Sequence, residues 1–376
     1  MREFALVFVV AAAATYLLTV IARDIALRLG AVAQVRDRDV HAVPIPYFGG
    51  LAMLGGMVAA FLVARHLPFL SESNELVWRD AGVVLIAGGM ICLVGVADDL
   101  LELDALTKLG GQVLAAGFLV FYEVQYWFWP QPGGGQLSLD RTQAALLTVF
   151  IVVATVNAVN FVDGLDGLAA GVVGIGACAF FVFAYQLAKL NGLDLSTTAA
   201  VLCAALAGAC AGFLPHNIYP ARLFMGDSGS MLIGLVLSGS ALTLTGQFST
   251  TDLTGAGGAR ANLLPTLLPV LLPISILIVP LADLVLAVVR RTRAGRSPFA
   301  PDKQHLHHRL LEIGHSHRRA VLIMWLWAGM LGFGTVFASL YTGRLMWLGL
   351  ATGLVITLLL TFAVPRVRTP HVLHDA

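Results

Sequence analysis

The sequence contains few charged residues. Asp, Glu, Lys and Arg together make up 12% of its 376 residues, whereas a soluble domain has about 25%. Hydrophobic residues make up 58%, and the mean hydropathy is +0.84. This composition excludes an ordinary soluble protein and indicates a polytopic membrane protein. The net charge of +1 gives no sign of a nucleic-acid partner.

Cysteine is also scarce. Cys92, Cys178, Cys203 and Cys210 all lie in apolar segments, without the spacing of a metal site. We therefore interpret them as small apolar core residues, not as zinc ligands or disulfide partners. The N-terminal apolar run has no small-residue cleavage site before the next polar stretch. It is therefore expected to be a retained span and not a signal peptide.

Apolar runs long enough to cross a membrane recur along the whole chain, and the segments between them are short. We therefore expect an all-α integral membrane protein with a single polytopic domain over residues 1–376. About eleven transmembrane helices are predicted, at residues 4–22, 48–67, 81–97, 109–129, 144–160, 167–189, 197–214, 228–246, 263–289, 320–341 and 345–364.

Lys and Arg are unevenly distributed between the two sets of loops. The loops after odd-numbered spans, together with the C-terminal tail, hold 16 of these residues, and the other side holds 7. Positive residues mark the cytoplasmic side of a membrane protein. The N-terminus is therefore predicted to lie outside and the C-terminus in the cytoplasm.

The polar motifs follow the same alternation, although the charge count did not use their acidic and histidine residues. All four come after odd-numbered spans: ADDLLELDALTK (97–108), NFVDGLDG (160–167), HNIYPARLFMGDSGS (216–230) and PDKQHLHHRL (301–310). A membrane protein that gathers Asp, Asn, His and Gly on one face is predicted to form its active site there. The site should face the cytoplasm and take a cytosolic substrate.

The stretch NAVNFVDGLDG places several polar residues at the end of the fifth predicted span. On a helix, Asn157, Asn160 and Asp163 fall within an arc of about 120°. Gly164 and Gly167 would then allow a tight turn or a close approach to a ligand. The alternative is that these residues only cap helices or lie in solvated loops. Their number at a membrane boundary favours a functional site.

Further carboxylates occur on the same predicted face. Two adjacent carboxylates such as Asp98 and Asp99 repel each other unless a cation or a proton lies between them. Asp227 precedes small residues, which suits a metal–phosphate site, although Asp227 or Ser228 also fits as a helix N-cap. Hard carboxylate oxygens predict Mg²⁺ as the cofactor, with Mn²⁺ as a substitute. The carboxylates concerned are Asp98, Asp99, Asp163, Asp166 and Asp227.

The motif HLHHRL supplies His305, His307, His308 and Arg309. Imidazole and guanidinium groups that face a carboxylate–Mg²⁺ cluster suit a diphosphate. Zinc is the alternative that these histidines could bind, but no cysteine accompanies them and the nearby acids suit a harder ion.

Three other polar residues are expected to act less directly. His315 and His317 are interpreted as surface or interface residues, and Asp283 as a residue that supports the basic loop or lines the site.

This set of residues predicts that a phosphorylated, water-soluble donor meets a phosphorylated lipid acceptor. The motifs resemble those of the polyprenyl-phosphate N-acetylhexosamine-1-phosphate transferases, which form glycosyltransferase family 4. ADD, NAVNFVDGLDGLAAG, FMGDSGS and SPFAPDKQHLHHRL occur in the family's order, and HAVPIPYFGG at 41–50 resembles its first cytoplasmic motif. The number of spans resembles the bacterial undecaprenyl- and decaprenyl-phosphate GlcNAc-1-phosphate branch, and the histidine motif is similar to that of the GlcNAc or GalNAc branch.

The resemblance implies transfer of N-acetylglucosamine 1-phosphate from UDP-GlcNAc to polyprenyl phosphate, with release of UMP. This is the first membrane step of cell-envelope glycan synthesis. It also implies the bacterial plasma membrane as the location and is compatible with a homodimer.

The resemblance further implies roles for the matching residues. Asp227 would be the main Mg²⁺ ligand, with Asp163 nearby. Asp98 would deprotonate or position the lipid phosphate, or help to hold the metal, and Asp99 would assist. The other implied roles are binding of the lipid phosphate by Lys108, contact with the metal or diphosphate by Asn160, a uridine pocket formed by Asn217, Asp166 and Phe224, and diphosphate and sugar contacts by His305, His307, His308 and Arg309.

Two alternatives to this function remain. The first is a phospho-MurNAc-pentapeptide transferase, although the histidine run that is usually continuous in those enzymes is interrupted here by Leu306. Tyr47 also stands where many relatives have Arg. An ion-coupled membrane transporter is the alternative from another class, but its acids would lie nearer the middle of the membrane. For the transferase, direct attack by the lipid phosphate is favoured over a phospho-aspartate intermediate, because no residue is clearly an activated nucleophile.

Overall fold

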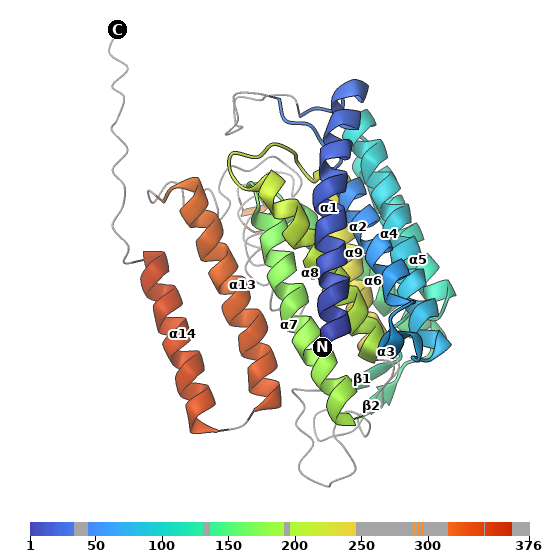
Figure 1. Cartoon of the computed structure of the whole chain (residues 1–376), viewed down its shortest axis with the longest axis vertical. Helices are drawn as coiled ribbons and strands as arrows, with labels where there is room; N and C mark the ends of the chain where they lie inside the picture. The colour runs from blue at the N-terminus through green and yellow to red at the C-terminus, as the bar shows by residue number, and fades with distance from the viewer. Residues whose placement is uncertain are drawn as a thin grey trace.

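A computed structural model describes residues 1–33, 44–130, 136–191, 196–245, 315–341 and 343–362, together with the isolated residues 289, 292, 293 and 295. The described residues form a bundle of helices (Figure 1). Its helices are α1 (Arg2–Leu29), α2 (Gly49–Ala64), α3 (Pro68–Ser71), α4 (Glu75–Leu101), α5 (Ala105–Phe121), α6 (Arg141–Val162), α7 (Leu168–Asn191), α8 (Ser196–Asn217), α9 (Gly226–Thr245), α13 (His317–Leu340) and α14 (Arg344–Phe362).

The polytopic membrane architecture is confirmed. In the part of the chain that the structure describes, eight helices are long and apolar enough to cross a membrane, and α2 and α5 are shorter apolar helices. Each of these ten helices overlaps one of the predicted spans. The span predicted at 263–289 lies outside the described residues.

The prediction of a helix over 109–129 is wrong at its C-terminal end. Helix α5 ends at Phe121, and Glu123 has a positive φ of 65°, which a continuing helix does not allow. The backbone amide of Tyr126 then donates to Thr148 Oγ1 at 2.9 Å, so the chain turns back onto α6. Hydropathy alone misses this end because Val124, Tyr126, Trp127 and Phe128 continue the apolar run beyond the helix.

The described residues agree with the predicted all-α class, to which they add a small hairpin. Strands β1 (Phe128–Pro130) and β2 (Gln136–Ser138) pair antiparallel, with Trp129 opposite Leu137. Pro130 disfavours a helix at this position because proline has no backbone N–H for the helical hydrogen bond. The hairpin lies at the same end of the bundle as the N-terminus of α1 (Figure 1).

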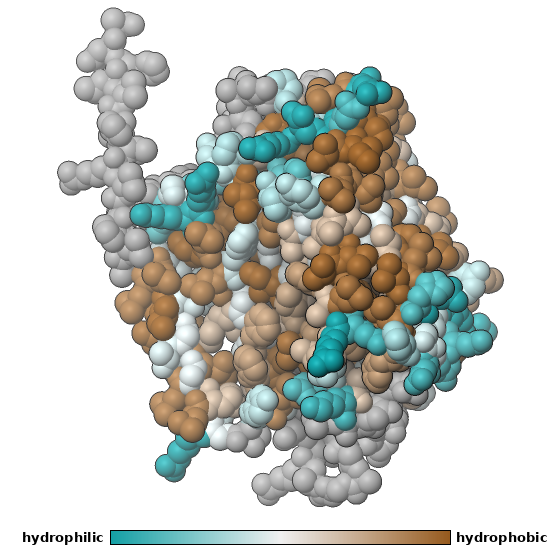
Figure 2. All heavy atoms as spheres, in the orientation of Figure 1, coloured by the Kyte–Doolittle hydropathy of each residue, from teal (hydrophilic) through white to brown (hydrophobic). Residues whose placement is uncertain are grey.

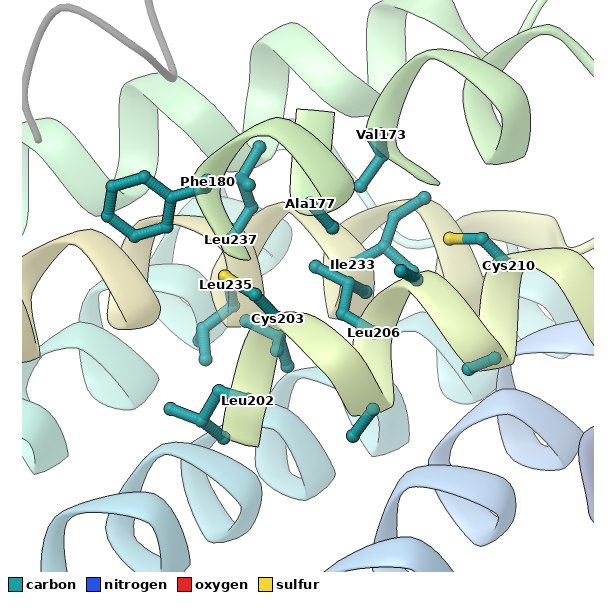
Figure 3. Packing of buried hydrophobic residues seen from close by; sticks show 14 of the residues in the cluster. Val173, Ala177, Phe180, Leu202, Cys203, Leu206, Cys210, Ile233, Leu235 and Leu237 are labelled. Atoms are coloured by element: carbon teal, nitrogen blue, oxygen red, sulfur yellow. The ribbon is translucent and has the colours of Figure 1, made fainter. Parts of the chain in front are cut away.

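Helices α8 and α9 form the centre of the bundle. In the apolar stretch that could cross a membrane, 89% of the residues of α8 and 94% of those of α9 are buried. Figure 3 shows side chains of α7, α8 and α9 that point toward one another, among them Phe180, Cys203, Cys210 and Ile233. Cys92, Cys203 and Cys210 are buried and Cys178 is partly buried, which agrees with their interpretation as small apolar residues.

The outer surface of the bundle is apolar between its ends. Figure 2 shows a broad brown region across the visible face, with hydrophilic side chains gathered toward the upper and lower ends. Helix α14 is the most peripheral helix of those described, and Leu345, Trp347 and Phe362 expose most of their side chains. Exposed apolar side chains on a membrane helix are expected to contact lipid.

Close backbone packing fixes the first turn of α9. A Cβ atom on Gly95 of α4 would overlap the backbone of Ser228, and one on Gly50 of α2 would overlap the backbone of Gly229. The amide of Gly50 also donates to the carbonyl of Met225 at 3.1 Å. These contacts require glycine and place α2, α4 and the start of α9 in a fixed relation.

Candidate active site

The polar motifs predicted from the sequence meet at one end of the bundle. This end carries the C-terminal ends of α4 and α6 and the N-terminal ends of α5 and α9, and it lies opposite the N-terminus of α1 (Figure 1). Hydrogen bonds and ion pairs join side chains from the motifs at 97–108, 160–167 and 216–230. The expectation that these three motifs share one face is confirmed.

Lys108 lies between two carboxylates. Its Nζ atom is 2.5 Å from Asp98 Oδ2 and 2.6 Å from Asp227 Oδ2. Asp104 caps α5 by accepting from two amides of the first turn, and this start places Lys108 one turn into the helix. The structure therefore brings together three residues from three helices that the sequence assigned to one site.

Asn160 holds the other oxygen of Asp227. Its Nδ2 atom donates to Asp227 Oδ1 at 2.9 Å and to Ser230 Oγ at 2.8 Å. Both oxygens of Asp227 therefore have a donor, one from Asn160 and one from Lys108. The predicted place of Asn160 beside the reacting groups agrees with this contact, and Ser230 is a partner that the sequence did not reveal.

The side chains of Asp98 and Asp99 contact different partners. Adjacent residues on a helix point about 100° apart. Asp98 therefore faces Lys108, while Asp99 Oδ1 accepts from the amide of Asp227 at 2.9 Å and Asp99 Oδ2 accepts from the amide of Ser228 at 3.4 Å. Asp99 thus caps α9 from α4. The alternative of a cap at these two amides by Asp227 or Ser228 is wrong.

Asp98 has one carboxylate oxygen that is not satisfied by the residues described. The residue is 9% exposed, and its Oδ1 atom is buried without a hydrogen-bond partner among them. Burying an acceptor without a partner is costly. The atom is thus available to accept a proton or a substrate hydrogen bond.

Asp163 ends α6 and lies in a field of negative charge. Burial and, to a smaller extent, the charges of Asp227, Asp99 and Asp166 together raise its pKa to about 8. With Asp98, five carboxylates gather at this end, and Lys108 contacts two of them, Asp98 and Asp227. Such an excess of carboxylate oxygen suits a hard divalent cation.

Within the described ranges, no three or more His, Cys, Asp or Glu side chains form a group that could hold a metal ion by themselves. Mg²⁺ usually takes only one or two carboxylates from a protein and completes its shell with water and substrate phosphates. Asp227 and Asp163 supply this kind of donor. The Mg²⁺ site therefore stays a prediction that the donor chemistry fits.

Two residues predicted for the uridine pocket fasten loops together. Asn217 accepts from the amide of Gly167 at 2.9 Å and donates to the carbonyl of Leu223 at 3.0 Å. Asp166 Oδ2 accepts from the amide of Ala221 at 2.9 Å. Gly167 has a φ of +75°, so the expected tight turn is present there. These bonds join the turn after α6 to the loop before α9.

Phe224, the predicted base-stacking residue, lies in this loop beside Tyr47. Their ring centroids are 6.2 Å apart, and the planes are inclined by 41°. The amide of Phe224 donates to the carbonyl of Pro46 at 2.9 Å, which fastens the segment before α2 to the segment before α9. Tyr47 therefore lies next to the predicted nucleotide pocket.

Helix α13 supports the same loops through residues that sequence reasoning missed. The indole Nε1 of Trp325 donates to the carbonyl of Gly167 at 3.1 Å, and Arg318 Nη2 donates to the carbonyl of Tyr219 at 3.0 Å. A Trp or Arg near the end of an apolar span carries no sequence signal for such a contact. Two further missed residues, Gln112 and Ser230, lie within apolar helices.

Of the two alternatives, a surface or an interface residue, His315 fits an interface within the chain. His315 is buried, and its Nε2 atom lies 3.2 Å from the carbonyl oxygen of Thr361 in α14. His317 stacks on Tyr219 with 4.4 Å between the ring centroids, so it forms an interface within the chain. The predicted site residues outside the described ranges are Asp283, His305, His307, His308 and Arg309.

Comparison with known proteins agrees with this arrangement. Residues 81–245 match the family described as glycosyl transferase family 4. The chain is 47% identical over 366 residues to a decaprenyl-phosphate N-acetylglucosaminephosphotransferase of Mycolicibacterium smegmatis, covering 96% of this chain and 89% of that protein.

More distant relatives differ in the donor that their names imply. The chain is 32% identical to a probable undecaprenyl-phosphate N-acetylglucosaminyl 1-phosphate transferase of Bacillus subtilis, covering 93% of this chain and 88% of that protein. It is 31% identical to a phospho-N-acetylmuramoyl-pentapeptide-transferase of Desulforudis audaxviator, covering 77% of this chain and 82% of that protein. With these likenesses and the shared motifs in place, the chain belongs to glycosyl transferase family 4.

Proposed function

We propose that this protein transfers N-acetylglucosamine 1-phosphate from UDP-GlcNAc to a polyprenyl phosphate, giving polyprenyl-diphosphate-GlcNAc and UMP. The contact of Lys108 with both Asp98 and Asp227 is the observation that carries the proposal. It provides one cation for a phosphate and two carboxylates with different surroundings at the end of a membrane bundle. The names of the mycolicibacterial relative at 47% identity and the Bacillus relative at 32% identity support the transferred group and the lipid class.

The reaction is proposed to be a direct displacement at phosphorus. An oxygen of the lipid phosphate attacks the β-phosphorus of UDP-GlcNAc and forms the new P–O bond. The bond from that phosphorus to the bridging oxygen breaks, and the electron pair leaves with UMP. In such transfers the protein acts mainly by positioning and by electrostatic stabilisation.

Asp98 and Lys108 are proposed to prepare the lipid phosphate. The ammonium of Lys108 binds the phosphate and lowers the repulsion between the two phosphorylated substrates. The Oδ1 atom of Asp98, which has no partner among the described residues, accepts a proton from the phosphate or orients it. Removal of this proton leaves an oxygen with a full charge for the attack.

Asp227 and Asp163 are proposed to hold Mg²⁺. When bound, the ion would neutralise charge on the diphosphate and stabilise the UMP leaving group. Asn160 orients Asp227 for this task by donating to its Oδ1 atom. Phe224 is proposed to stack on the uracil, while His305, His307, His308 and Arg309 are proposed to contact the diphosphate and sugar.

We further propose eleven spans, with the N-terminus outside and the site in the cytoplasmic face of a bacterial plasma membrane. The uneven distribution of Lys and Arg among the loops supports this orientation. A cytoplasmic site gives the water-soluble UDP-sugar access, while the lipid enters from the membrane. A homodimer would be compatible with this arrangement.

A transfer assay with purified protein in detergent tests the proposal. The protein receives polyprenyl phosphate and UDP-GlcNAc labelled in the sugar, with and without Mg²⁺, and both lipid label and UMP are measured. The expected result is Mg²⁺-dependent label in the lipid with an equal amount of UMP. Asp227→Ala should lower this rate by at least about a hundredfold.

Other outcomes distinguish the alternatives. Transfer from UDP-MurNAc-pentapeptide in place of UDP-GlcNAc would retain the reaction and overturn the donor. Failure with every UDP-sugar, in protein shown to be folded, would overturn the transferase. Ion-dependent uptake into vesicles by the same folded protein would then favour the transporter.

A further inference from the structure

A second polar layer lies one helical turn deeper in the bundle than the ion pairs of Lys108. Residues three or four positions apart on a helix lie on the same face. Each member of the deeper layer has this spacing from a site residue on its own helix. The pairs are Lys108 and Gln112 in α5, Asn160 and Asn157 in α6, and Asp227 and Met231 in α9.

Gln112 and Asn157 form a reciprocal amide pair in this layer. Asn157 Nδ2 donates to Gln112 Oε1 at 2.6 Å, and Gln112 Nε2 donates to Asn157 Oδ1 at 3.3 Å. Gln112 Nε2 also lies 3.7 Å from the Sδ atom of Met231. Gln112 is 3% exposed, so its amide would be costly to bury without these partners. The pair therefore links α5 to α6 and α9.

The part of helix α5 around Lys108 has no buried residue before Gln112. No residue from Ala105 to Gly111 is buried, and Gln112 is the first buried residue of the helix. Leu106 is 78% exposed and Leu114 is 69% exposed, so this part of α5 faces outward. Lys108 is consequently carried by a turn whose nearest buried anchor is Gln112.

The amide pair becomes important when a phosphate binds. A phosphate on Lys108 competes with Asp98 and Asp227 for the ammonium, so the ion pairs weaken at the moment when the lysine must stay in place. The bonds of Gln112 do not involve the ammonium and persist. They therefore maintain the distance of α5 from α6 and α9.

We infer that Gln112 and Asn157 are positioning residues for Lys108 in the lipid-phosphate site. This inference rests on the proposed function and deepens it. The pair fixes the position of α5 and thereby the position of the Lys108 ammonium. The donor nucleotide is proposed to bind at the loops before α7 and α9, so its binding should not depend on the pair.

Steady-state kinetics of Gln112→Leu and Asn157→Leu test the inference. Each variant should lower kcat/KM for polyprenyl phosphate by about three- to twentyfold, the range for a hydrogen bond between membrane helices. The KM for UDP-GlcNAc should stay at the wild-type value. The double variant should lose no more than either single variant, because the first substitution already breaks the pair.

Gln143→Leu is the matched control, since it makes the same substitution at the other end of α6. Gln143 forms a capping box with Asp140, so this variant should lose heat stability and keep the KM for lipid. The exchanged pair Gln112→Asn with Asn157→Gln restores two facing amides and should recover much of the lost kcat/KM. If Gln112→Leu does not fold, Asn157→Leu provides the test, because Asn157 is exposed.

Two results would overturn the inference while the wild type stays active. One is an unchanged kcat/KM for lipid in both folded single variants. The other is an equal loss when Gln112→Leu is made in a Lys108→Met background, because the effect would then not pass through Lys108. A wild type without transfer activity would overturn the proposed function itself.

Discussion

Asp99→Asn tests whether this carboxylate acts on a substrate or holds α9. The asparagine keeps an oxygen for the amide of Asp227, which donates to Asp99 at 2.9 Å. An NH₂ group replaces the oxygen that faces the amide of Ser228 at 3.4 Å, so two donors then face each other. The substitution also removes negative charge from the N-terminus of α9.

The expected loss follows from these two contacts. Losing a helix N-cap costs about 0.5–2 kcal/mol, and losing a charge at a helix N-terminus costs about 0.3–1 kcal/mol. We therefore expect a loss of about 1–2 kcal/mol, which is a factor of about 5–30 if the same contacts position Asp227. Asp99→Ala should lose more, because both acceptors disappear.

Two measurements on each variant are needed. Heat stability in detergent reports the cap, and kcat with saturating substrates reports the position of Asp227. We expect both to decrease together, with kcat for Asp99→Asn within about thirtyfold of wild type. A loss of about a thousandfold in kcat at unchanged heat stability would refute the capping role and make Asp99 a catalytic residue.

Three further predictions concern neighbouring residues. Lys108→Met should lower kcat/KM for polyprenyl phosphate by about a hundredfold, and an unchanged value in steady-state assays would remove Lys108 from the lipid site. Asp163 has a folded pKa of about 8, above its ordinary value of 3.8, so its contribution to stability is lost as the pH rises through about 8. In EDTA, the melting temperature of Asp163→Asn should therefore exceed that of the wild type at pH 8 and be close to it near pH 4. Added Mg²⁺ should reduce the difference at pH 8, and equal melting temperatures at pH 8 in EDTA would contradict this. Trp325→Phe removes the bond to Gly167, worth about 0.5–1.5 kcal/mol, and should raise the KM for UDP-GlcNAc while the KM for lipid is kept; an unchanged KM for UDP-GlcNAc would contradict the support of this turn by α13.

The helices could be predicted because apolar length is a strong signal in a membrane chain. Each predicted span within the described residues overlaps a helix, and the error at α5 occurs where apolar residues continue past Phe121. After the turn at Glu123 the chain bonds to α6 through Tyr126, and β1 pairs with β2, and hydropathy contains neither contact. The length of an apolar run therefore predicts where a span lies better than it predicts where the span ends.

The composition of the site was predictable, but its contacts were not. The motifs indicated that Asp98, Lys108 and Asp227 belong together, and the ion pairs agree. The sequence DD suggested a shared cation, whereas the helical twist sends Asp98 to Lys108 and Asp99 to the amides of α9.

Long-range partners were the hardest to predict. Gln112 is a lone amide among apolar residues, which is a weak sign of a partner on another helix. Trp325 gave no sign at all, because an aromatic residue is ordinary in an apolar span. Such contacts depend on how helices far apart in the sequence pack together.

The most direct measurement follows the β-phosphorus of the donor. Purified protein receives polyprenyl phosphate, Mg²⁺ and UDP-GlcNAc labelled with ³²P at the β-position, and the lipid and nucleotide products are separated. The account predicts that the β-label enters the lipid and that the released nucleotide is unlabelled UMP. Release of labelled UDP, with an unlabelled lipid product, would show transfer of the sugar without its phosphate and would contradict the account.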